Sequence, residues 1–377
     1  MLRVAMIGFG GIAHSGHIKN HFALEEEGRE KLVAVCDIRP ELFEQKIVIN
    51  TGGAEVSLRE DVARYTDWKE MLDKEDVDVV DICVPTFLHK DITIQVLKMG
   101  YHVLCEKPMS PSYEDCLEMC KAEKEYGKRL MIGHCVRFGT AMNVIKKFID
   151  EKTYGKVKHA QFRRLSGPPK WGWDNWYMDY NRSGGCIRDL HVHDIDFARY
   201  VFGEPRKISC VTADKYSGKD IVQSHLVYDG FSAMVIGDWS REGFPFQASC
   251  EISFENATVT LGAGEIKICQ RDGEVFNYQF TANNSYKAEM EYFFDIIEND
   301  ITSLTASNKI TPNNTPIKLS NLSFLVTSSI KHGTIINKVH HPLKNIFIFV
   351  ISSAFNPKIT PKTISTTPHN IELTLFI

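Results

Sequence analysis

A glycine-rich segment directly after the first apolar run constrains the fold of this chain more than any other feature. Residues 2–7 are apolar except for Arg3. The segment that follows consists of Gly8, Phe9, Gly10, Gly11, Ile12 and Ala13. In such a G-x-G-x-x-A pattern the glycines allow a tight turn and close backbone approach to a ligand, and the alanine lets a helix pack on the strand. The pattern predicts a strand–turn–helix unit that binds a pyrophosphate at the helix N-terminus.

An aspartate follows the second predicted strand. The strand over 31–36 ends at Asp37, where a carboxylate binds the ribose hydroxyls of an adenosine. The acidic residues 25–27 place Asp37 slightly beyond the usual spacing of about 20 residues. Because its charge repels a 2′-phosphate, Asp37 favours NAD as the cofactor. Arg39 and Arg29 leave NADP open as the alternative.

The first part of the chain alternates between strand and helix patterns. Strands are predicted over 77–84, 102–105 and 130–133, with helices over 89–98 and 112–126. This rhythm predicts a doubly wound parallel sheet of the Rossmann type over residues 1–136, covered by helices on both faces. The ligands should then lie along the edge formed by the carboxyl ends of the strands.

Two of these carboxyl ends carry residues that suit a binding site. Pro85 and Thr86 follow one strand, and Glu106-Lys107-Pro108 follows the next. A lysine at this edge is placed to contact a bound dinucleotide and its substrate. The alternative is a surface Glu–Lys pair before a proline that starts a helix.

From about residue 140 the pattern changes to long strands with alternating polarity. The predicted strands cover 157–165, 208–214, 222–228, 232–239, 248–254, 258–261 and 266–270. Such strands are typical of a largely antiparallel sheet with one face more exposed. We therefore expect a second, α+β domain over 137–300 with a large open sheet for the substrate and for oligomerisation.

A histidine and an aspartate stand four residues apart within this second domain. If residues 184–196 form one helix after Gly184-Gly185, Asp189 and His193 share a face. Asp189 would then lie in the first turn, and His193 would act as a general base with a pKa near working pH. The alternative is a capping aspartate and a buried structural histidine, and Asp196 is expected to pair with Arg199.

Taken together, these motifs resemble the glucose–fructose oxidoreductase/inositol dehydrogenase family of NAD(P)-dependent oxidoreductases. The matching pieces are residues 8–13, 85–89, 106–108, Arg137 after Gly133-His134, and 184–199, within a resemblance that runs from residue 1 to about 300. The resemblance implies that Lys107, Asp189 and His193 carry the chemistry. It also places Pro85, Thr86, His89, Glu106 and Lys107 against the cofactor. The family usually has Asn where Thr86 stands.

The resemblance implies reversible oxidation of a secondary alcohol on a sugar, cyclitol or polyol. Two alternatives stay open: an NAD-dependent glycosidase that oxidises a ring carbon transiently, and a non-catalytic sensor of dinucleotide and sugar. Arg137 and an aromatic loop with Trp171, Trp176 and Tyr177 are the expected substrate contacts. A packed loop or a subunit contact would explain the same aromatic residues.

Five basic residues bear on the charge of the expected substrate. They are Arg163, Arg164, Lys170, Arg182 and Arg188, and they select an acidic or phosphorylated sugar unless they form a solvated face.

Composition excludes several classes of protein. The net charge of −4 gives no nucleic-acid footprint, and the ten scattered cysteines indicate a reducing, cytoplasmic compartment. No cysteine or histidine spacing suggests a metal, and the chain starts directly in a strand, which predicts no signal peptide. The apolar run 346–351 is far shorter than the roughly 20 residues of a membrane span. We expect a homodimer or homotetramer, since the broad sheet leaves a large apolar face.

The last 77 residues differ from the rest of the chain in net charge and in amino-acid composition. Residues 301–377 carry a net charge of +6, against −10 for the first 300, and 41 of them are Ile, Ser, Thr or Asn. We expect a divergent or out-of-frame tail that is mostly disordered and lacks the helix with which relatives return to the first domain. The alternative is an extension with its own fold.

Overall fold

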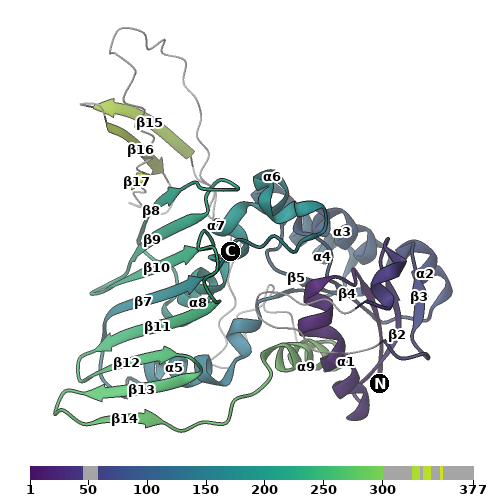
Figure 1. Ribbon diagram of the computed structural model, residues 1–377, viewed down its shortest axis with the longest axis horizontal. Coiled ribbons are helices and arrows are strands. Elements are labelled where there is room, and N and C mark those ends of the chain that lie inside the picture. The colour runs from purple at the N-terminus through teal and green to yellow at the C-terminus, as the bar shows by residue number, and fades with distance from the viewer. Residues whose placement is uncertain (46–57, 300–324, 332–333, 341–348, 351–377) are drawn as a thin grey trace.

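The computed structural model describes residues 1–45, 58–299, 325–331, 334–340 and 349–350. Two domains lie side by side, each built on its own sheet (Figure 1). No helix in the described part of the chain is both long and apolar enough to cross a membrane.

The first domain holds a six-stranded sheet in the order β3-β2-β1-β4-β5-β6. All of its neighbouring strands run parallel, which confirms the predicted doubly wound sheet. Its strands are β1 (Leu2–Ile7), β2 (Glu30–Cys36), β3 (Ala63–Tyr65), β4 (Val79–Ile82), β5 (His102–Glu106) and β6 (Leu130–Gly133). The strand order reverses beside β1, so the binding crevice lies at the carboxyl ends of β1 and its neighbours.

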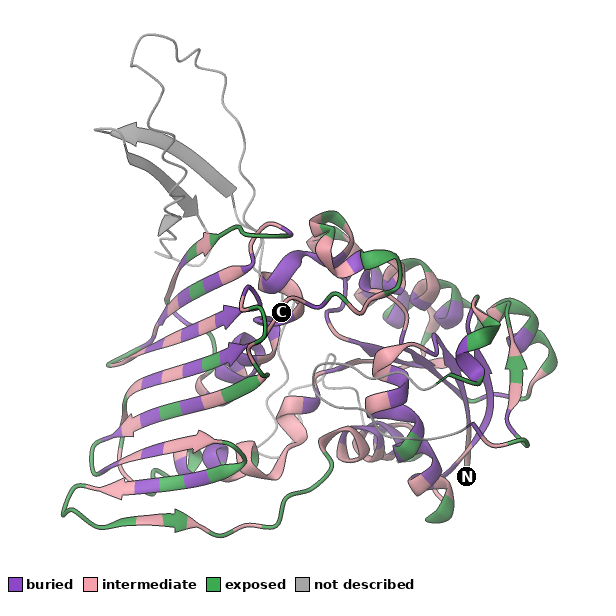
Figure 2. Ribbon diagram, viewed as in Figure 1, coloured by how far each residue is buried: buried purple, intermediate pink, exposed green. Residues whose placement is uncertain are grey.

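Helices cover both faces of this sheet. They are α1 (Ile18–Glu26), α2 (Trp68–Lys74), α3 (His89–Met99), α4 (Tyr113–Tyr126) and α9 (Ser285–Glu298). Local sequence signals set the ends of α4. Ser112 caps its N-terminus by accepting a hydrogen bond from Asp115 N, and Gly127 ends it with a φ of 65°. Burial is nearly continuous along the inner strands, as expected for strands covered on both faces (Figure 2).

α9 is the last described helix before residue 300, and it packs on the first domain. Met290, Phe293 and Phe294 are each about 1% exposed and share one core with Val4 and Met6 of β1. The returning helix whose absence we expected belongs to the range 301–377, most of which lies outside the described residues. That expectation therefore stays a prediction.

The second domain holds a sheet in the order β14-β13-β12-β11-β7-β10-β9-β8-β17. Its strands between residues 157 and 278 are β7 (Val157–Leu165), β8 (Lys207–Ala213), β9 (Ile221–Val227), β10 (Ser232–Asp238), β11 (Gln247–Phe254), β12 (Ala257–Gly262), β13 (Glu265–Gln270) and β14 (Val275–Tyr278). Seven of these strands were predicted, and β14 was not. The pairing is antiparallel except between β7 and β10 and between β8 and β17, which confirms a mostly antiparallel sheet.

In the described part of the chain, helices cover one face of this sheet and not the other. Residues alternate between buried and more exposed along each strand (Figure 2). The buried set packs against α5 (Thr140–Asp150) and α8 (Val192–Phe202). Two further short helices, α6 (Tyr180–Ser183) and α7 (Gly185–Asp189), face the first domain.

Three strands belong to the C-terminal range 301–377. β15 (Leu325–Lys331) and β16 (Thr334–His340) pair with each other, and β17 (Phe349–Val350) pairs with β8. The rest of this range lies outside the described residues. The expectation of a mostly disordered tail therefore stays a prediction.

Candidate active site

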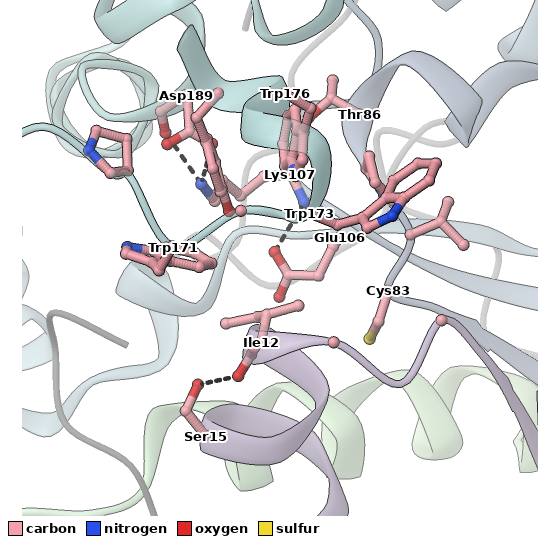
Figure 3. Close-up of a pocket in the computed structure, with 18 of the residues that line it drawn as sticks. Ile12, Ser15, Cys83, Thr86, Glu106, Lys107, Trp171, Trp173, Trp176 and Asp189 are labelled. Carbon is pink, nitrogen blue, oxygen red and sulfur yellow. Dashed lines mark hydrogen bonds and ion pairs between the residues drawn. The ribbon is translucent and has the colours of Figure 1, made fainter. Parts of the chain in front are cut away.

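A cavity of about 900 Å³ is lined by residues of both domains. It extends from Asp37 past the glycine loop to Lys107 and His193, and Figure 3 shows how part of its lining is arranged. Its floor is the carboxyl edge of the parallel sheet, as the strand order requires.

The glycine loop has the geometry of a phosphate cradle. Gly8 has a φ of 94°, and a Cβ at this position would lie 2.7 Å from the backbone of Cys83. At Gly10, which lines the cavity, a Cβ would meet nothing within 4 Å. Gly8 is therefore required by the turn, whereas Gly10 leaves open space for a ligand. This arrangement fits a dinucleotide pyrophosphate.

Asp37 is fixed by backbone donors at one end of the cavity. Its two carboxylate oxygens accept hydrogen bonds from Phe9 N at 2.8 Å and from Arg39 N at 2.9 Å. The Arg39 guanidinium also lies 5.6 Å from the ring centre of Trp173, which comes from the second domain. The side chain of Phe9 is buried in the core and does not line the cavity, so its predicted contact with the cofactor is limited to backbone.

Lys107 and Asp189 meet at the opposite end of the cavity. Lys107 Nζ donates to Asp189 Oδ1 and to the Asp189 carbonyl oxygen, each at 3.0 Å (Figure 3). Asp189 is the last residue of α7, and α8 begins only at Val192. Our expectation of one continuous helix with Asp189 in its first turn was therefore wrong. The carboxylate is held by the lysine and not by a helix N-terminus.

His193 lines the same end of the cavity, and no carboxylate of the described residues is bonded to it. Burial, followed by the positive charges of Lys107 and Arg164, holds the pKa of His193 well below its usual value. The predicted pKa near working pH was wrong, because burial and the nearby positive charges disfavour the imidazolium, and Asp189 is bonded to Lys107. A neutral imidazole at this position is able to accept a proton.

Besides Phe9, two predicted site residues lie outside the cavity lining. His89 is buried, and its ring nitrogens bond the carbonyl oxygens of Pro108 and Val84, each at 2.9 Å. Arg137 donates from Nε to Asp196 at 2.7 Å. These contacts make His89 a link between two loops and Arg137 part of a buried ion pair. The expected partner of Asp196, Arg199, bonds Glu204 instead.

The predicted aromatic residues do line the cavity. Trp176 stacks on Tyr177 at a centroid distance of 3.8 Å, and Trp171 packs edge-on against Tyr177 at 4.6 Å. Burial keeps the pKa of Tyr177 well above its usual value, so its hydroxyl stays protonated. Trp173 of the aromatic loop and Arg164 of the basic set also line the cavity, together with Ser166, Trp239, Phe246 and Tyr286, which we did not predict. No local motif marks Tyr286, which α9 brings from far along the chain.

One buried group near the cavity has the composition of a metal site. His17, Asp81 and Cys83 each place a potential ligand atom within 4.8 Å of the others. Both ring nitrogens of His17 are already bonded to carboxylates, Asp81 at 2.7 Å and Glu106 at 2.9 Å. The ring therefore has no lone pair left for an ion, and we interpret the group as a hydrogen-bond network.

Comparison with known proteins agrees with this arrangement. Residues 2–134 match the family described as "Oxidoreductase family, NAD-binding Rossmann fold", and residues 142–260 match the "GFO/IDH/MocA C-terminal domain". The chain belongs to the GFO/IDH/MocA family of oxidoreductases. The family resemblance inferred from the motifs is confirmed, and the first domain is an NAD-binding domain.

Individual relatives of this GFO/IDH/MocA chain differ in their named activities. An inositol 2-dehydrogenase of Rhizobium meliloti is 30% identical over 318 residues, which cover 79% of this chain and 89% of that protein. A 2,7-anhydro-N-acetylneuraminate hydratase of Mediterraneibacter gnavus is 30% identical over 193 residues, so the chain spans only 48% of its length. A levoglucosan dehydrogenase solved with NADH and levoglucosan shares the fold, with a TM-score of 0.66 at 21% identity over 79% of this chain and 90% of that one.

Proposed function

We propose that this chain transfers a hydride between a nicotinamide cofactor and a secondary alcohol of an uncharged sugar, cyclitol or polyol. The observation that carries the proposal is the meeting of Lys107 and His193 at the end of the cavity opposite Asp37. A dinucleotide whose adenosine binds at Asp37 and whose pyrophosphate binds at the glycine loop would direct its nicotinamide to this end.

The side chains at this end suit the oxidation of an alcohol. The bound nicotinamide supplies the hydride acceptor. The neutral His193 accepts the hydroxyl proton, and the Lys107 ammonium donates a hydrogen bond to the reacting oxygen. Asp189 holds Lys107 in place through two contacts of 3.0 Å. The Tyr177 hydroxyl is a further donor for a substrate hydroxyl.

The charge balance around the cavity supports an uncharged substrate. Four lysine and arginine side chains are among the described lining residues: Lys19, Arg39, Lys107 and Arg164. Arg164 forms two bonds with Asp194, at 2.8 and 3.0 Å, while Lys107 and Arg39 contact Asp189 and Asp37. The remaining cation, Lys19, belongs to α1, directly after the glycine loop. A substrate phosphate or carboxylate at the reactive end would therefore have to compete with the aspartate that already pairs with Lys107 or Arg164.

Two more of the basic residues that suggested an acidic substrate are also paired with carboxylates. Lys170 pairs with Glu242 at 3.0 Å, and Arg182 pairs with Asp174 at 2.9 Å. The aromatic walls of Trp171, Trp176 and Tyr177 instead suit the apolar face of a sugar or cyclitol ring.

An NADH-fluorescence screen tests this function directly. Purified protein with NAD is offered neutral polyols, cyclitols, aldoses and glycosides, each beside its phosphate or uronate counterpart. NADH formation with at least one neutral compound, at least about tenfold faster than with its charged counterpart, would support the proposal. Turnover of charged sugars alone would contradict it.

A second candidate is a reaction that returns the hydride to the substrate. The similarity to a hydratase favours it, because hydration causes no net change in redox state. A glycosidase that oxidises a ring carbon transiently would be another enzyme that returns the hydride to its substrate. Such an enzyme would consume its substrate without accumulating NADH. A non-catalytic sensor, which is the third alternative, would bind the sugar without consuming it.

A further inference from the structure

Five buried side chains form one continuous hydrogen-bonded chain beneath the cavity. Glu30 contacts His21 at 2.8 Å, and His21 contacts Asp81 at 2.9 Å. Asp81 contacts His17 at 2.7 Å, and His17 contacts Glu106 at 2.9 Å. Carboxylates and imidazoles therefore alternate from β2, across β4, to the carboxyl end of β5.

With all three carboxylates ionised, the hydrogen-bond geometry requires both imidazoles in this chain to be charged. Each ring lies between two carboxylates, and an ionised carboxylate only accepts hydrogen bonds. A neutral imidazole has one N–H, so only an imidazolium satisfies both neighbours. Although burial opposes it, the charge of Asp81 raises the pKa of His17 well above its usual value. The chain thus contains three acidic groups and two cations.

The far end of the chain is closed. Glu30 is 0% exposed, and its Oε2 has no hydrogen-bond partner among the described residues. Tyr286 of α9 covers His17 with a ring-centroid distance of 5.5 Å. The described residues thus offer no outlet for protons at the Glu30 end, so we treat the effect of the chain on the cavity as electrostatic and positional.

The open end of the chain is Glu106, which lines the cavity. Its Oε1 bonds His17, and its Oε2 accepts from Lys107 N at 3.0 Å (Figure 3). Asp37 directly follows β2, and Glu106 ends β5, and these two strands lie on opposite sides of β1. A dinucleotide that spans the glycine loop from Asp37 therefore places its nicotinamide beside Glu106. The nicotinamide ring is a cation when oxidised and neutral when reduced.

We infer that His17, held by Asp81 and His21, is a positioning residue that keeps Glu106 ionised and fixed at the nicotinamide end, so that the site prefers the oxidised over the reduced cofactor. The reason is electrostatic, since a fixed anion in a partly buried site attracts a cationic ring and not a neutral one. Preferential binding of the oxidised form makes the bound reduced cofactor a stronger hydride donor. The inference depends on the cofactor and not on the identity of the substrate.

Binding of NAD⁺ and NADH to the protein without substrate tests this inference. The dissociation constants are measured by calorimetry and by NADH fluorescence for the wild type and for Glu106→Gln, His17→Gln and the double variant. Removing the anion in Glu106→Gln should raise the ratio Kd(NAD⁺)/Kd(NADH) about tenfold or more. His17→Gln should change the ratio in the same direction, because a buried carboxylate that loses its charged donor takes up a proton. The ratio in the double variant should be close to the ratio in either single variant, because both changes remove the same charge.

A matched control separates this effect from simple loss of packing. His191 is also 0% exposed, does not line the cavity and bonds Ser224 at 2.9 Å in the second domain. His191→Gln should leave the ratio unchanged. The inference is overturned if His17→Gln weakens NAD⁺ and NADH binding by equal factors, or if the two single changes multiply in the double variant. Should His17→Gln fail to fold, an unchanged ratio in Glu106→Gln alone overturns it.

Discussion

At the scale of single residues, three buried cation–carboxylate pairs surround the reactive end of the cavity. They are Lys107 with Asp189, Arg164 with Asp194, and Arg137 with Asp196. Each aspartate neutralises one cation, and His193 is left without an acidic neighbour. The protonation state of His193 therefore follows from contacts that other residues make.

We expect Lys107 and His193 to affect turnover much more than NAD binding. Lys107→Ala and His193→Ala should each lower turnover on the best substrate by roughly 10²-fold or more, because each removes a group that handles a proton or the reacting oxygen. NAD binding, measured by titration, should stay within a few-fold. Lys158→Ala, which removes a half-exposed lysine paired with Glu255, is the control and should retain full activity. Near-full activity of His193→Ala would show that another group is the base.

Asp37 should determine the choice between NAD and NADP. Its carboxylate is fixed by Phe9 N and Arg39 N, so it cannot turn away from a 2′-phosphate. We expect calorimetric titration to show NAD binding about tenfold or more tighter than NADP. In Asp37→Ser this difference should shrink. Equal affinity in the wild type would mean that the Arg39 guanidinium outweighs the carboxylate.

At the scale of elements, two helices from opposite parts of the chain complete the first domain. α1 and the helical turn directly before it (Ala13–His17) carry the two histidines of the buried chain. α9 covers this chain with Tyr286 and fills the core with Phe293 and Phe294. The cofactor site is therefore not formed by the first 136 residues alone.

Removal of a large side chain from α9 should destabilise the protein strongly. Phe293 is 1% exposed in the core of the first domain. Phe293→Ala should lower the free energy of unfolding in urea by about 3–5 kcal/mol through lost burial and an unfilled cavity. Val275→Ala on β14, at a side chain that is 54% exposed, should change it by about 0.5 kcal/mol or less. Similar values for the two variants would contradict the packing of α9 on the sheet.

The buried histidines should make stability depend on pH in the alkaline range. Burial opposes the charge on His21, but Glu30 and Asp81 raise its pKa to about 9. A pKa that is higher in the folded state stabilises that state fully below the unfolded value of about 6.5, and the stabilisation is lost as pH rises to about 9. The stability advantage of the wild type over His21→Gln should therefore be largest near pH 6 and fall by on the order of 1–3 kcal/mol by about pH 9.

His102 provides the control for this pH dependence. Burial lowers the pKa of His102 to about 4, so its ring stays neutral across the alkaline range. The stability difference between the wild type and His102→Gln should therefore be constant above about pH 7. A constant difference for His21→Gln as well would show that the buried chain is uncharged.

At the scale of the whole molecule, the large sheet has one face that no described helix covers. Ala233 and Val235 of β10 point into the core with α8, so Met234 and Ile236 point to the opposite face. Polar side chains such as Gln161 and Glu251 accompany them on neighbouring strands. This face is mixed in polarity and less apolar than the sequence suggested.

We still expect the protein to assemble through this face. Light scattering at micromolar concentration should give a dimer or tetramer, that is, two or four times 42.9 kDa. Ile236→Glu should shift the mass toward the monomer, since it places a charge at the centre of the face, whereas Lys158→Ala should not. A monomer mass for the wild type would refute the expected assembly.

The sequence by itself determined the architecture, because the glycine loop, the periodicities and the strand ends are local patterns. It placed Asp37, Thr86, Lys107 and the aromatic loop correctly on the cavity, since each follows a strand or lies near one in sequence. Tertiary structure alone decided which charges pair: Asp189 with Lys107, Asp196 with Arg137, and His17 between Asp81 and Glu106. These partners are tens of residues apart, and local periodicity carries no information about such distances. The pKa of His193 depends on the same pairings, so only the folded chain sets it.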